Sequence, residues 1–268
     1  MKERGGSRIR GKKMNLRFDL VVASSLFYVI YAVPKANYMI KHPEKYSEQK
    51  RFEFGCRIMD FMRKRSRTKT YVYGMENLPE DENYILYANH QGKYDALGIL
   101  LALEKPCGVL WEKRQAKRFM SRQVSGLIGA VPIDLNDMRD KVAAITEVTK
   151  QVRDGRNMLI FPEGGYKDNG NCLQEFNSGC FHCSLRSKAT MVPVVIYDSY
   201  KAMNSNSLRR VTTEVHFLPP IPYSEYSGLK KPELASLIKE RVSAKLEEIK
   251  ARNRAGKPCG EQLDKVLE

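Results

Sequence analysis

The sequence predicts an α/β fold: a mixed, largely parallel sheet with helices on both faces, preceded by an N-terminal helical pair. From residue 68 onward, short β-rich runs alternate with amphipathic helical patterns. Before residue 68 the pattern is helical, without strand alternation. Hydrophobic residues make up 42% of the 268 residues, which is enough for a sizeable core and excludes wholesale disorder. We therefore divide the chain into an N-terminal segment, 1–67, and an α/β domain, 68–268.

The start of the N-terminal segment combines a basic stretch with an uncharged one. Residues 1–17 contain seven Lys or Arg and one Glu, whereas Leu20–Val33 contains no charged residue. This arrangement favours an anionic membrane surface over a nucleic acid as partner. The uncharged run has 14 residues, fewer than the roughly 20 of a spanning helix, and we expect Pro34 to end it. The alternatives are a flexible tail before a core helix, and a signal peptide, although no clean cleavage site follows.

We interpret Asp19–Val33 and Pro43–Arg65 as a helical pair that rests on a bilayer. Four apolar residues of the second helix recur at spacings of four and three and share one face: Phe52, Cys56, Met59 and Met62. The alternative is a pair of ordinary amphipathic helices packed on the domain. The basic tail and this pair together form the predicted membrane-binding segment.

The first half of the α/β domain is predicted to contain four strands. They are Thr68–Gly74, Asn83–Ala88, Cys107–Trp111 and Ala130–Asp134. Helices are expected between them at Asp95–Leu103 and at about Lys113–Leu127.

The second half begins with a helix that Asp137 caps and Gly155 ends. Its expected core positions are Val142, Ile145, Val148 and Val152. Strands follow in NMLIFPEGG (157–165), MVPVVIY (191–197) and VTTEVHFLP (211–219). The final helix, Pro232–Arg252, carries one apolar side made of Leu234, Ile238, Val242, Leu246 and Ile249.

An unusual polar run, NHQGKYD (89–95), directly follows the apolar strand YILYA. Histidine is the usual general base of enzymes that work near neutral pH, so His90 is a candidate for that role. A tight turn through Gly92 would bring the Asp95 carboxylate back to the imidazole and fix its tautomer. Because no Ser or Cys lies between them, the pair suggests deprotonation of a substrate hydroxyl. The alternative is a strand-end His bonded to its own loop, with Asp95 as a helix cap.

This His-x4-Asp pattern resembles the first motif of the glycerolipid acyltransferases, specifically the 1-acyl-glycerol-3-phosphate acyltransferase family. Three further blocks follow in that family's order: GAVPID (Gly129–Asp134), FPEGG (Phe161–Gly165) and VPVVI (Val192–Ile196). The stretch EFNSGCFHC also resembles the segment after the third motif. The resemblance covers roughly Tyr71 to Pro222.

The resemblance implies transfer of a fatty acyl group from a thioester, on coenzyme A or acyl carrier protein, to a glycerol hydroxyl. The implied acceptor is 1-acyl-glycerol-3-phosphate, and the product is phosphatidic acid, used in phospholipid synthesis. His90 would be the general base and Asp95 its orienting partner. No metal or redox cofactor is implied, because the thioester supplies the activation. The alternative is an acyltransferase for another lysophospholipid or glycerolipid acceptor.

The chain departs from this family's pattern where a phosphate would be held. Leu135 and Tyr166 stand where arginines are usual, Gly92 replaces a Ser, and Gly165 replaces a Thr. The predicted substrate-binding residues are Asn89, Gln91, Lys93, Glu163, Gly164, Gly165 and Lys167. Among them, the two lysines or the backbone N–H groups of the two glycines would replace the missing arginines on the phosphate. Glu163 cannot grip a phosphate, and we expect it to hold the loop.

Six cysteines are spread along the chain, which indicates a reducing compartment rather than a disulfide framework. CFHC (Cys180–Cys183) has the spacing of a metal half-site, but no second pair exists, so we interpret these residues as core filling. Trp111 is interpreted as a packing residue.

The net charge of +15 leaves one rival from another class, a basic nucleic-acid-binding protein. No basic patch interleaved with aromatic residues supports it. We expect a peripheral or monotopic enzyme at the cytoplasmic face of a membrane, with an anionic membrane surface, a lysophospholipid and an acyl thioester as its partners.

Overall fold

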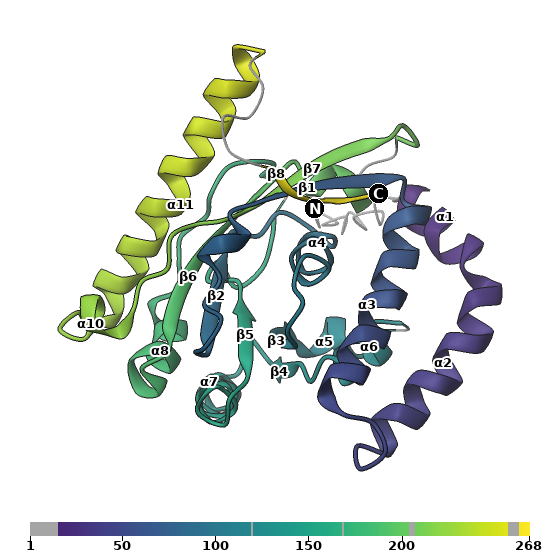
Figure 1. The fold of residues 1–268 in the computed structure, drawn as a ribbon, viewed down its shortest axis with the longest axis horizontal. Helices are drawn as coiled ribbons and strands as arrows, with labels where there is room; N and C mark the ends of the chain where they lie inside the picture. Colours follow the sequence, from purple (N-terminus) through teal and green to yellow (C-terminus); the bar gives the residue numbers. More distant parts are fainter. Residues whose placement is uncertain (1–15, 119, 168, 204–206, 257–262) are drawn as a thin grey trace, which may run out of the picture.

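The computed structural model describes residues 16–118, 120–167, 169–203, 207–256 and 263–268 (Figure 1). Its centre is an eight-stranded sheet with the order β4-β3-β5-β2-β6-β7-β1-β8. The strands are β1 (Thr68–Tyr73), β2 (Tyr84–Ala88), β3 (Cys107–Glu112), β4 (Val131–Ile133), β5 (Asn157–Ile160), β6 (Thr190–Tyr197), β7 (Val211–Phe217) and β8 (Leu263–Leu267). Of the predicted basic stretch, 1–17, residues 1–15 lie outside the described residues.

The sheet is mixed and largely parallel, as predicted. Strands β4, β3, β5, β2 and β6 run parallel to one another, β7 pairs antiparallel with β6, and β8 pairs antiparallel with β1. The β2 residues are all buried, as expected for a strand covered on both faces. The carboxyl ends of the five parallel strands share one edge, where ligands bind in open α/β sheets.

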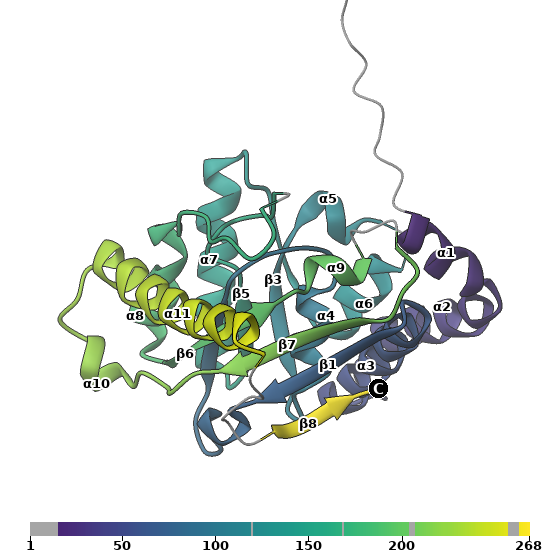
Figure 2. The same ribbon diagram turned by 90° about the horizontal axis from the view of Figure 1, so that it is seen from above.

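Helices cover both faces of the sheet (Figures 1 and 2). One side carries α1 (Leu16–Ser24), α2 (Leu26–Lys41), α3 (Glu48–Arg65), α4 (Asp95–Leu100), α5 (Lys113–Ala116) and α6 (Ser121–Leu127). The other carries α7 (Met138–Arg153), α8 (His182–Ser187) and α11 (Lys231–Arg254). Short connecting turns are η1 (Met75–Asn77), η2 (Ser178–Phe181), α9 (Tyr200–Met203) and α10 (Tyr223–Tyr226).

Helix α2 continues through Pro34, so the prediction that Pro34 ends this helix is wrong. The proline ring removes one helical hydrogen bond, but residues on either side of it are fixed by tertiary packing. Ala32, Ala36 and Met39 are buried against the domain. The break falls earlier, at Ser25, whose hydroxyl donates to Val21 O across 2.5 Å.

The N-terminal helices pack on the domain along one face only. Gly126 of α6 faces Ile40 so closely that a Cβ there would lie 2.7 Å from its Cδ1. The opposite face of α1 and α2 carries exposed large apolar residues: Leu20, Leu26, Phe27, Ile30, Tyr31 and Tyr38. Within the described chain, no helix combines the length and apolar character needed to cross a membrane.

Two further sequence predictions need correction. Val142 of α7 is 62% exposed and is not a core position, whereas Val148 and Val152 are buried as predicted. Ile145 is partly buried and packs against the core, and Ala144 and Thr149 complete the buried face, because the helix is turned slightly about its axis. The helix expected at Lys113–Leu127 is divided into α5 and α6, with Met120 at a φ of +66° before α6. The Asp137 cap and the five buried positions of the last helix are confirmed.

Candidate active site

The turn between β2 and α4 brings His90 and Asp95 together, as their spacing predicts. β2 ends at Ala88, α4 begins at Asp95, and the Asp95 N–H donates to Gly92 O across 3.4 Å. His90 Nδ1 lies 2.6 Å from Asp95 Oδ2. The carboxylate therefore fixes the proton on Nδ1 and leaves Nε2 as the basic nitrogen.

Asp95 is fully buried, yet both of its oxygens are hydrogen-bonded. Besides the imidazole, Oδ2 accepts the N–H groups of Gln91 (2.5 Å) and Gly92 (2.9 Å). Oδ1 accepts the hydroxyl of Ser199 across 2.5 Å. Four donors around one buried carboxylate stabilise its charge and fix its position.

Two aromatic rings hold the imidazole in place. The His90 ring stacks on Phe161, with centroids 4.3 Å apart and an interplanar angle of 21°. Tyr166 meets the same ring edge-on at 4.9 Å. The His90 side chain remains 18% exposed, so a substrate can reach it from solvent. Tyr166, which stands at one of the expected arginine positions, is thus part of the packing around the base.

Glu163 supports the loop, as the sequence suggested. Its Oε1 accepts the His90 N–H at 3.0 Å, and its Oε2 accepts Gln174 Nε2 at 2.6 Å. Burial raises the pKa of the Glu163 carboxyl, while the hydrogen bonds from His90 and Gln174 oppose this shift. Gln174 also donates to Gly165 O at 2.7 Å, which holds two parts of the connection between β5 and η2 together. The bond between the His90 N–H and Glu163 joins this connection to the loop between β2 and α4.

Asn89 and Gln91 are not placed to touch a substrate, so this part of the substrate-site prediction is corrected. Both side chains are only 2% exposed. Asn89 exchanges two hydrogen bonds with the backbone of Ile196, at 3.0 and 2.8 Å. Gln91 donates to Ile196 O at 2.9 Å and accepts the Ser199 N–H at 2.9 Å. The two amides therefore clamp the loop to the end of β6.

The remaining substrate-binding candidates, two glycines and two lysines, differ in whether they are accessible to a substrate. The Gly164 N–H already donates to Phe161 O at 3.0 Å, so it is not available to a phosphate. Gly165 and Lys167 are exposed on the same loop as Tyr166, and Lys93 is half-buried within the His90 loop. Gly164 and Gly165 have φ values of +72° and +157°, which only glycine adopts without strain. The loop thus presents Gly165 and Lys167 beside the ring that packs on His90.

Ser199 is the functional residue that the sequence reasoning missed. It is fully buried, 104 residues from the carboxylate that it contacts. The available signal was its place two residues after the end of β6, since β2 and β6 are adjacent and parallel. Polar residues at the ends of such strands meet at one sheet edge.

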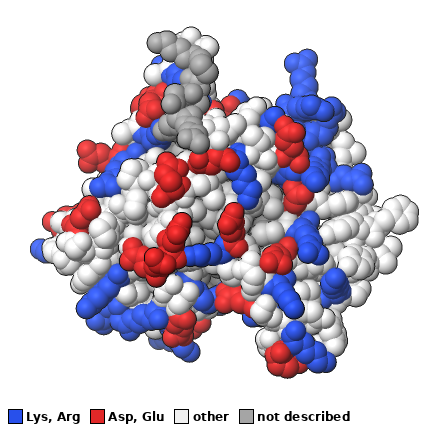
Figure 3. Space-filling view, in the orientation of Figure 1, with Lys and Arg blue, Asp and Glu red and all other residues white. Residues whose placement is uncertain are grey.

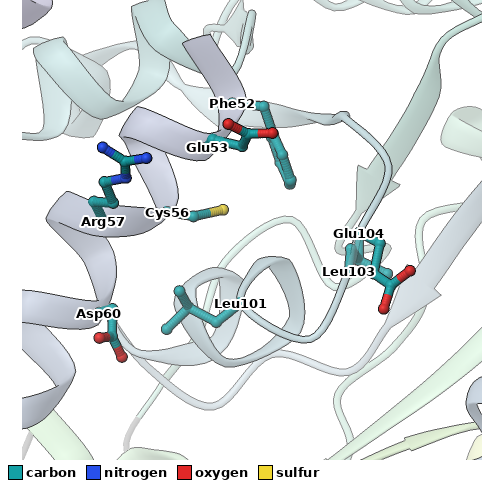
Figure 4. A pocket seen from close by; sticks show the side chains of 8 residues that line it. All are labelled: Phe52, Glu53, Cys56, Arg57, Asp60, Leu101, Leu103 and Glu104. Carbon is teal, nitrogen blue, oxygen red and sulfur yellow. The ribbon is translucent and has the colours of Figure 1, made fainter. Parts of the chain in front are cut away.

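A hollow of about 390 Å³ at the other end of α4 is separate from this site (Figure 4). Its lining mixes Leu101 and Leu103 with Arg57 and two glutamates, and Cys56 points into it. Burial raises the pKa of the Cys56 thiol to about 12, so the thiol is protonated and a poor nucleophile at neutral pH. We assign no chemistry to this hollow.

The cysteines of CFHC are engaged locally. Cys183 is buried, and its Sγ donates to Cys180 O at 2.8 Å, while Cys180 Sγ donates to Asn177 O at 3.0 Å. Burial raises the pKa of both thiols, to about 11 for Cys183. Among the residues that the structure describes, no group of three or more His, Cys, Asp or Glu is placed to hold a metal ion.

Comparison with known proteins finds similarity in sequence and in fold. Residues 69–197 match the family model described as Acyltransferase. The chain is 27% identical over 184 residues to the 1-acyl-sn-glycerol-3-phosphate acyltransferase of Borreliella burgdorferi, covering 68% of this chain and 73% of that protein. It is 28% identical over 190 residues to the human 1-acyl-sn-glycerol-3-phosphate acyltransferase alpha, covering 69% of this chain and 66% of that protein.

The Escherichia coli 1-acyl-sn-glycerol-3-phosphate acyltransferase is 28% identical over 180 residues, which cover 65% of this chain and 73% of that protein. A similar fold is found in the crystal structure of the 1-acyl-sn-glycerophosphate (LPA) acyltransferase PlsC from Thermotoga maritima. The TM-score is 0.67, with 21% identity, over 89% of this chain and 95% of that chain.

Proposed function

Residues 69–197 place this chain in the acyltransferase family, and from this premise we propose that it acylates 1-acyl-glycerol-3-phosphate to phosphatidic acid. The acyl group would come from a thioester of coenzyme A or acyl carrier protein. The observation that carries the proposal is the buried Asp95 carboxylate, 2.6 Å from Nδ1 of a histidine that is open to solvent. The matched relatives bear the name of this activity.

The reaction follows from the arrangement of the pair. His90 Nε2 takes the proton of the acceptor hydroxyl, while the oxygen attacks the thioester carbonyl carbon. Asp95 stabilises the imidazolium that forms. When the tetrahedral intermediate collapses, the C–S bond breaks, and the imidazolium returns its proton to the departing thiolate. The thioester supplies the activation, so the proposal includes no metal or redox cofactor.

The acceptor's phosphate is proposed to lie against the loop that carries Gly165 and Lys167. Lys167 is exposed and directly follows Tyr166, whose ring meets His90. A lysine is a point charge, so it would hold the phosphate with less geometric strictness than the bidentate arginines. Lys93, inside the catalytic loop, is the second candidate cation.

An anionic membrane surface is the proposed partner of the exposed apolar face of α1 and α2. Figure 3 shows uncharged surface over α2, with basic groups beside it near α1 and α3. Leu26, Phe27 and Ile30 are the most exposed large hydrophobic residues of this face. An apolar helix face flanked by cations is typical of interfacial binding. This face would bring the catalytic edge to its lipid substrates, as a peripheral or monotopic protein.

An acceptor panel tests the proposal. The purified protein is assayed with lysophosphatidic acid, other lysophospholipids and monoacylglycerol, with both thioester donors and with metal chelated. We expect lysophosphatidic acid to be preferred, and Lys167→Ala to raise its KM about ten- to a hundredfold, as loss of a charge-assisted hydrogen bond predicts. Equal use of monoacylglycerol, unchanged in Lys167→Ala, would favour an acceptor without a terminal phosphate. Salt-sensitive DNA binding without acyl transfer would favour the nucleic-acid alternative.

A further inference from the structure

A second hollow, of about 510 Å³, lies beside the carboxyl ends of β3 and β4. It is lined by residues of α2, β3, α5, α6 and β4, among them Ile40, Lys41, Trp111, Lys117 and Arg122. We call it the Trp111 hollow. Neither the catalytic pair nor the predicted phosphate residues line it.

The apolar wall of the Trp111 hollow is built by strand alternation. Leu110 and Trp111 are neighbours on β3 and point to opposite faces of the sheet. Accordingly, Leu110 packs with the α7 side and Trp111 with the α2–α6 side. Trp111 contacts the core, as a packing residue should, but it is only partly buried and also lines the hollow together with Ile40 and Pro132. Part of the Trp111 side chain thus lines the hollow next to apolar residues.

The rim of the Trp111 hollow is basic and lacks acidic groups. Its lining contains Lys41, Lys113, Lys117 and Arg122, but no Asp or Glu. Lys113 is neutralised by an ion pair with Asp140. The other three cations have no acidic partner within the described part of the chain. Unpaired cations around an aromatic surface fit an anion that carries a flat ring, such as a nucleoside phosphate.

The position of the hollow indicates which substrate brings this anion. β3 lies two strands from β2 in a parallel array, so its end is on the order of 10 Å from the His90 loop along the same edge, at about 4.8 Å per strand. In lysophosphatidic acid the phosphate is only a few bonds from the reacting hydroxyl. With the hydroxyl at His90, this phosphate could not reach the Trp111 hollow. In coenzyme A the long pantetheine arm separates the thioester from the phosphates and the adenine.

We propose that the Trp111 hollow binds the nucleotide end of an acyl-coenzyme A donor, with the adenine on Trp111 and the phosphates near Lys41, Lys117 and Arg122. This inference rests on the proposed acyl transfer for the identity of the donor. The pantetheine arm would then run along the sheet edge toward His90.

Binding is measured without turnover through Trp111, which is the single tryptophan of the chain. The full-length protein is titrated with coenzyme A, inorganic phosphate and lysophosphatidic acid, and tryptophan fluorescence is recorded. We expect a saturable change with coenzyme A, weakened about tenfold or more in Lys117→Ala/Arg122→Ala through loss of charge-assisted bonds. The charge-matched control, Lys231→Ala/Arg254→Ala on α11, should bind like wild type. No response to coenzyme A, or equal binding by both double variants, would overturn the proposal, as would a response to lysophosphatidic acid alone.

Kinetics then separates failure of this inference from failure of the proposed function. In Lys117→Ala/Arg122→Ala we expect the KM for acyl-coenzyme A to rise about tenfold or more, with kcat and the KM for lysophosphatidic acid unchanged. With acyl-pantetheine, which lacks the nucleotide, the variant and wild type should be equal. A protein that binds coenzyme A in the hollow but does not acylate lysophosphatidic acid would contradict only the proposed function. Active enzyme whose donor KM is unaffected would contradict only this inference.

Discussion

The His90 loop and the outer face of α1 and α2 are opposite exceptions to the usual distribution of polar and apolar groups. In the loop, Asp95, Asn89 and Gln91 are buried, and each has its polar atoms hydrogen-bonded. On the outer face, Phe27 is 86% exposed and Ile30 is 67% exposed. Scattered exposed hydrophobic residues are normal, but a contiguous group marks a surface that something else covers.

The two regions contribute differently to the free energy of folding. Burying a carboxylate without hydrogen-bond partners would cost several kcal/mol of folding free energy. The donors around Asp95 therefore hold the loop as one unit, and removing one donor weakens the position of the carboxylate and of the groups bonded to it. Burying apolar surface stabilises a protein by roughly 25 cal/mol per Å². The outer face lacks this stabilisation while it is in water and gains it when a partner covers the face. The His90 loop is preorganised, whereas the apolar residues of the outer face are buried only when a partner binds. Substitutions in the His90 loop should therefore lower kcat, and substitutions on the outer face should weaken binding to the membrane.

The largest expected effect is at His90, which tests whether the loop is built for chemistry. In His90→Ala we expect kcat to fall about 10²- to 10⁴-fold, because the base is gone. The variant also removes one hydrogen-bond donor from Asp95, so we expect a loss of about 1–3 kcal/mol in unfolding free energy without loss of the fold. His42→Ala, which removes an exposed His paired with Glu44, is the matched control and should keep full activity. Near-normal turnover in folded His90→Ala would refute the mechanism.

Asp95→Asn asks whether the charge of the carboxylate matters beyond its shape. The amide is isosteric, its oxygen can face the N–H donors, and its nitrogen can donate to Ser199. We expect the fold to persist and kcat to fall about 10²-fold, because the imidazolium loses its stabilising anion. Stopped assays with matched circular dichroism spectra would measure this. Wild-type kcat in this variant would reduce Asp95 to a helix cap.

The outer face is tested by charge insertion. Phe27→Asp/Ile30→Asp should weaken binding to anionic vesicles about tenfold or more, because carboxylates are repelled by the surface and cannot enter the apolar region. Met138→Asp/Val142→Asp places the same charges on exposed apolar residues of α7 and is the control. Vesicle sedimentation at two salt concentrations compares the pairs. Similar vesicle binding by both variants would remove the distinction between this face and ordinary exposed hydrophobic residues.

The smallest expected effect is at Ser199. This variant tests whether losing one donor to Asp95 lowers kcat as well as stability. Ser199→Ala leaves Asp95 Oδ1 without its donor, so we expect a loss of about 1–3 kcal/mol in unfolding free energy. kcat should fall up to about tenfold, with the substrate KM values unchanged, because the carboxylate is less firmly held. Denaturant unfolding and steady-state kinetics measure both. A destabilised variant with full kcat would make Ser199 purely structural.

Features that depend on local patterns could be predicted from the sequence. Alternation and helical periodicity gave the order of most strands and helices, and a strand–turn–helix spacing brought His90 and Asp95 together. The capping of α7 by Asp137 was equally local. Such features are encoded within a few residues, because backbone preferences and side-chain direction act over one or two turns.

Features that depend on residues far apart in the sequence could not be predicted, because they arise only when the sheet assembles. Only the adjacency of β2 and β6 places Ser199 on Asp95 and gives Asn89 and Gln91 a clamping role. Packing carries α2 through Pro34, and pairing with β1 makes a strand of β8, which no local pattern had indicated. These outcomes follow from which surfaces meet when the sheet assembles. The burial gained there exceeds the weak local preferences that a sequence displays.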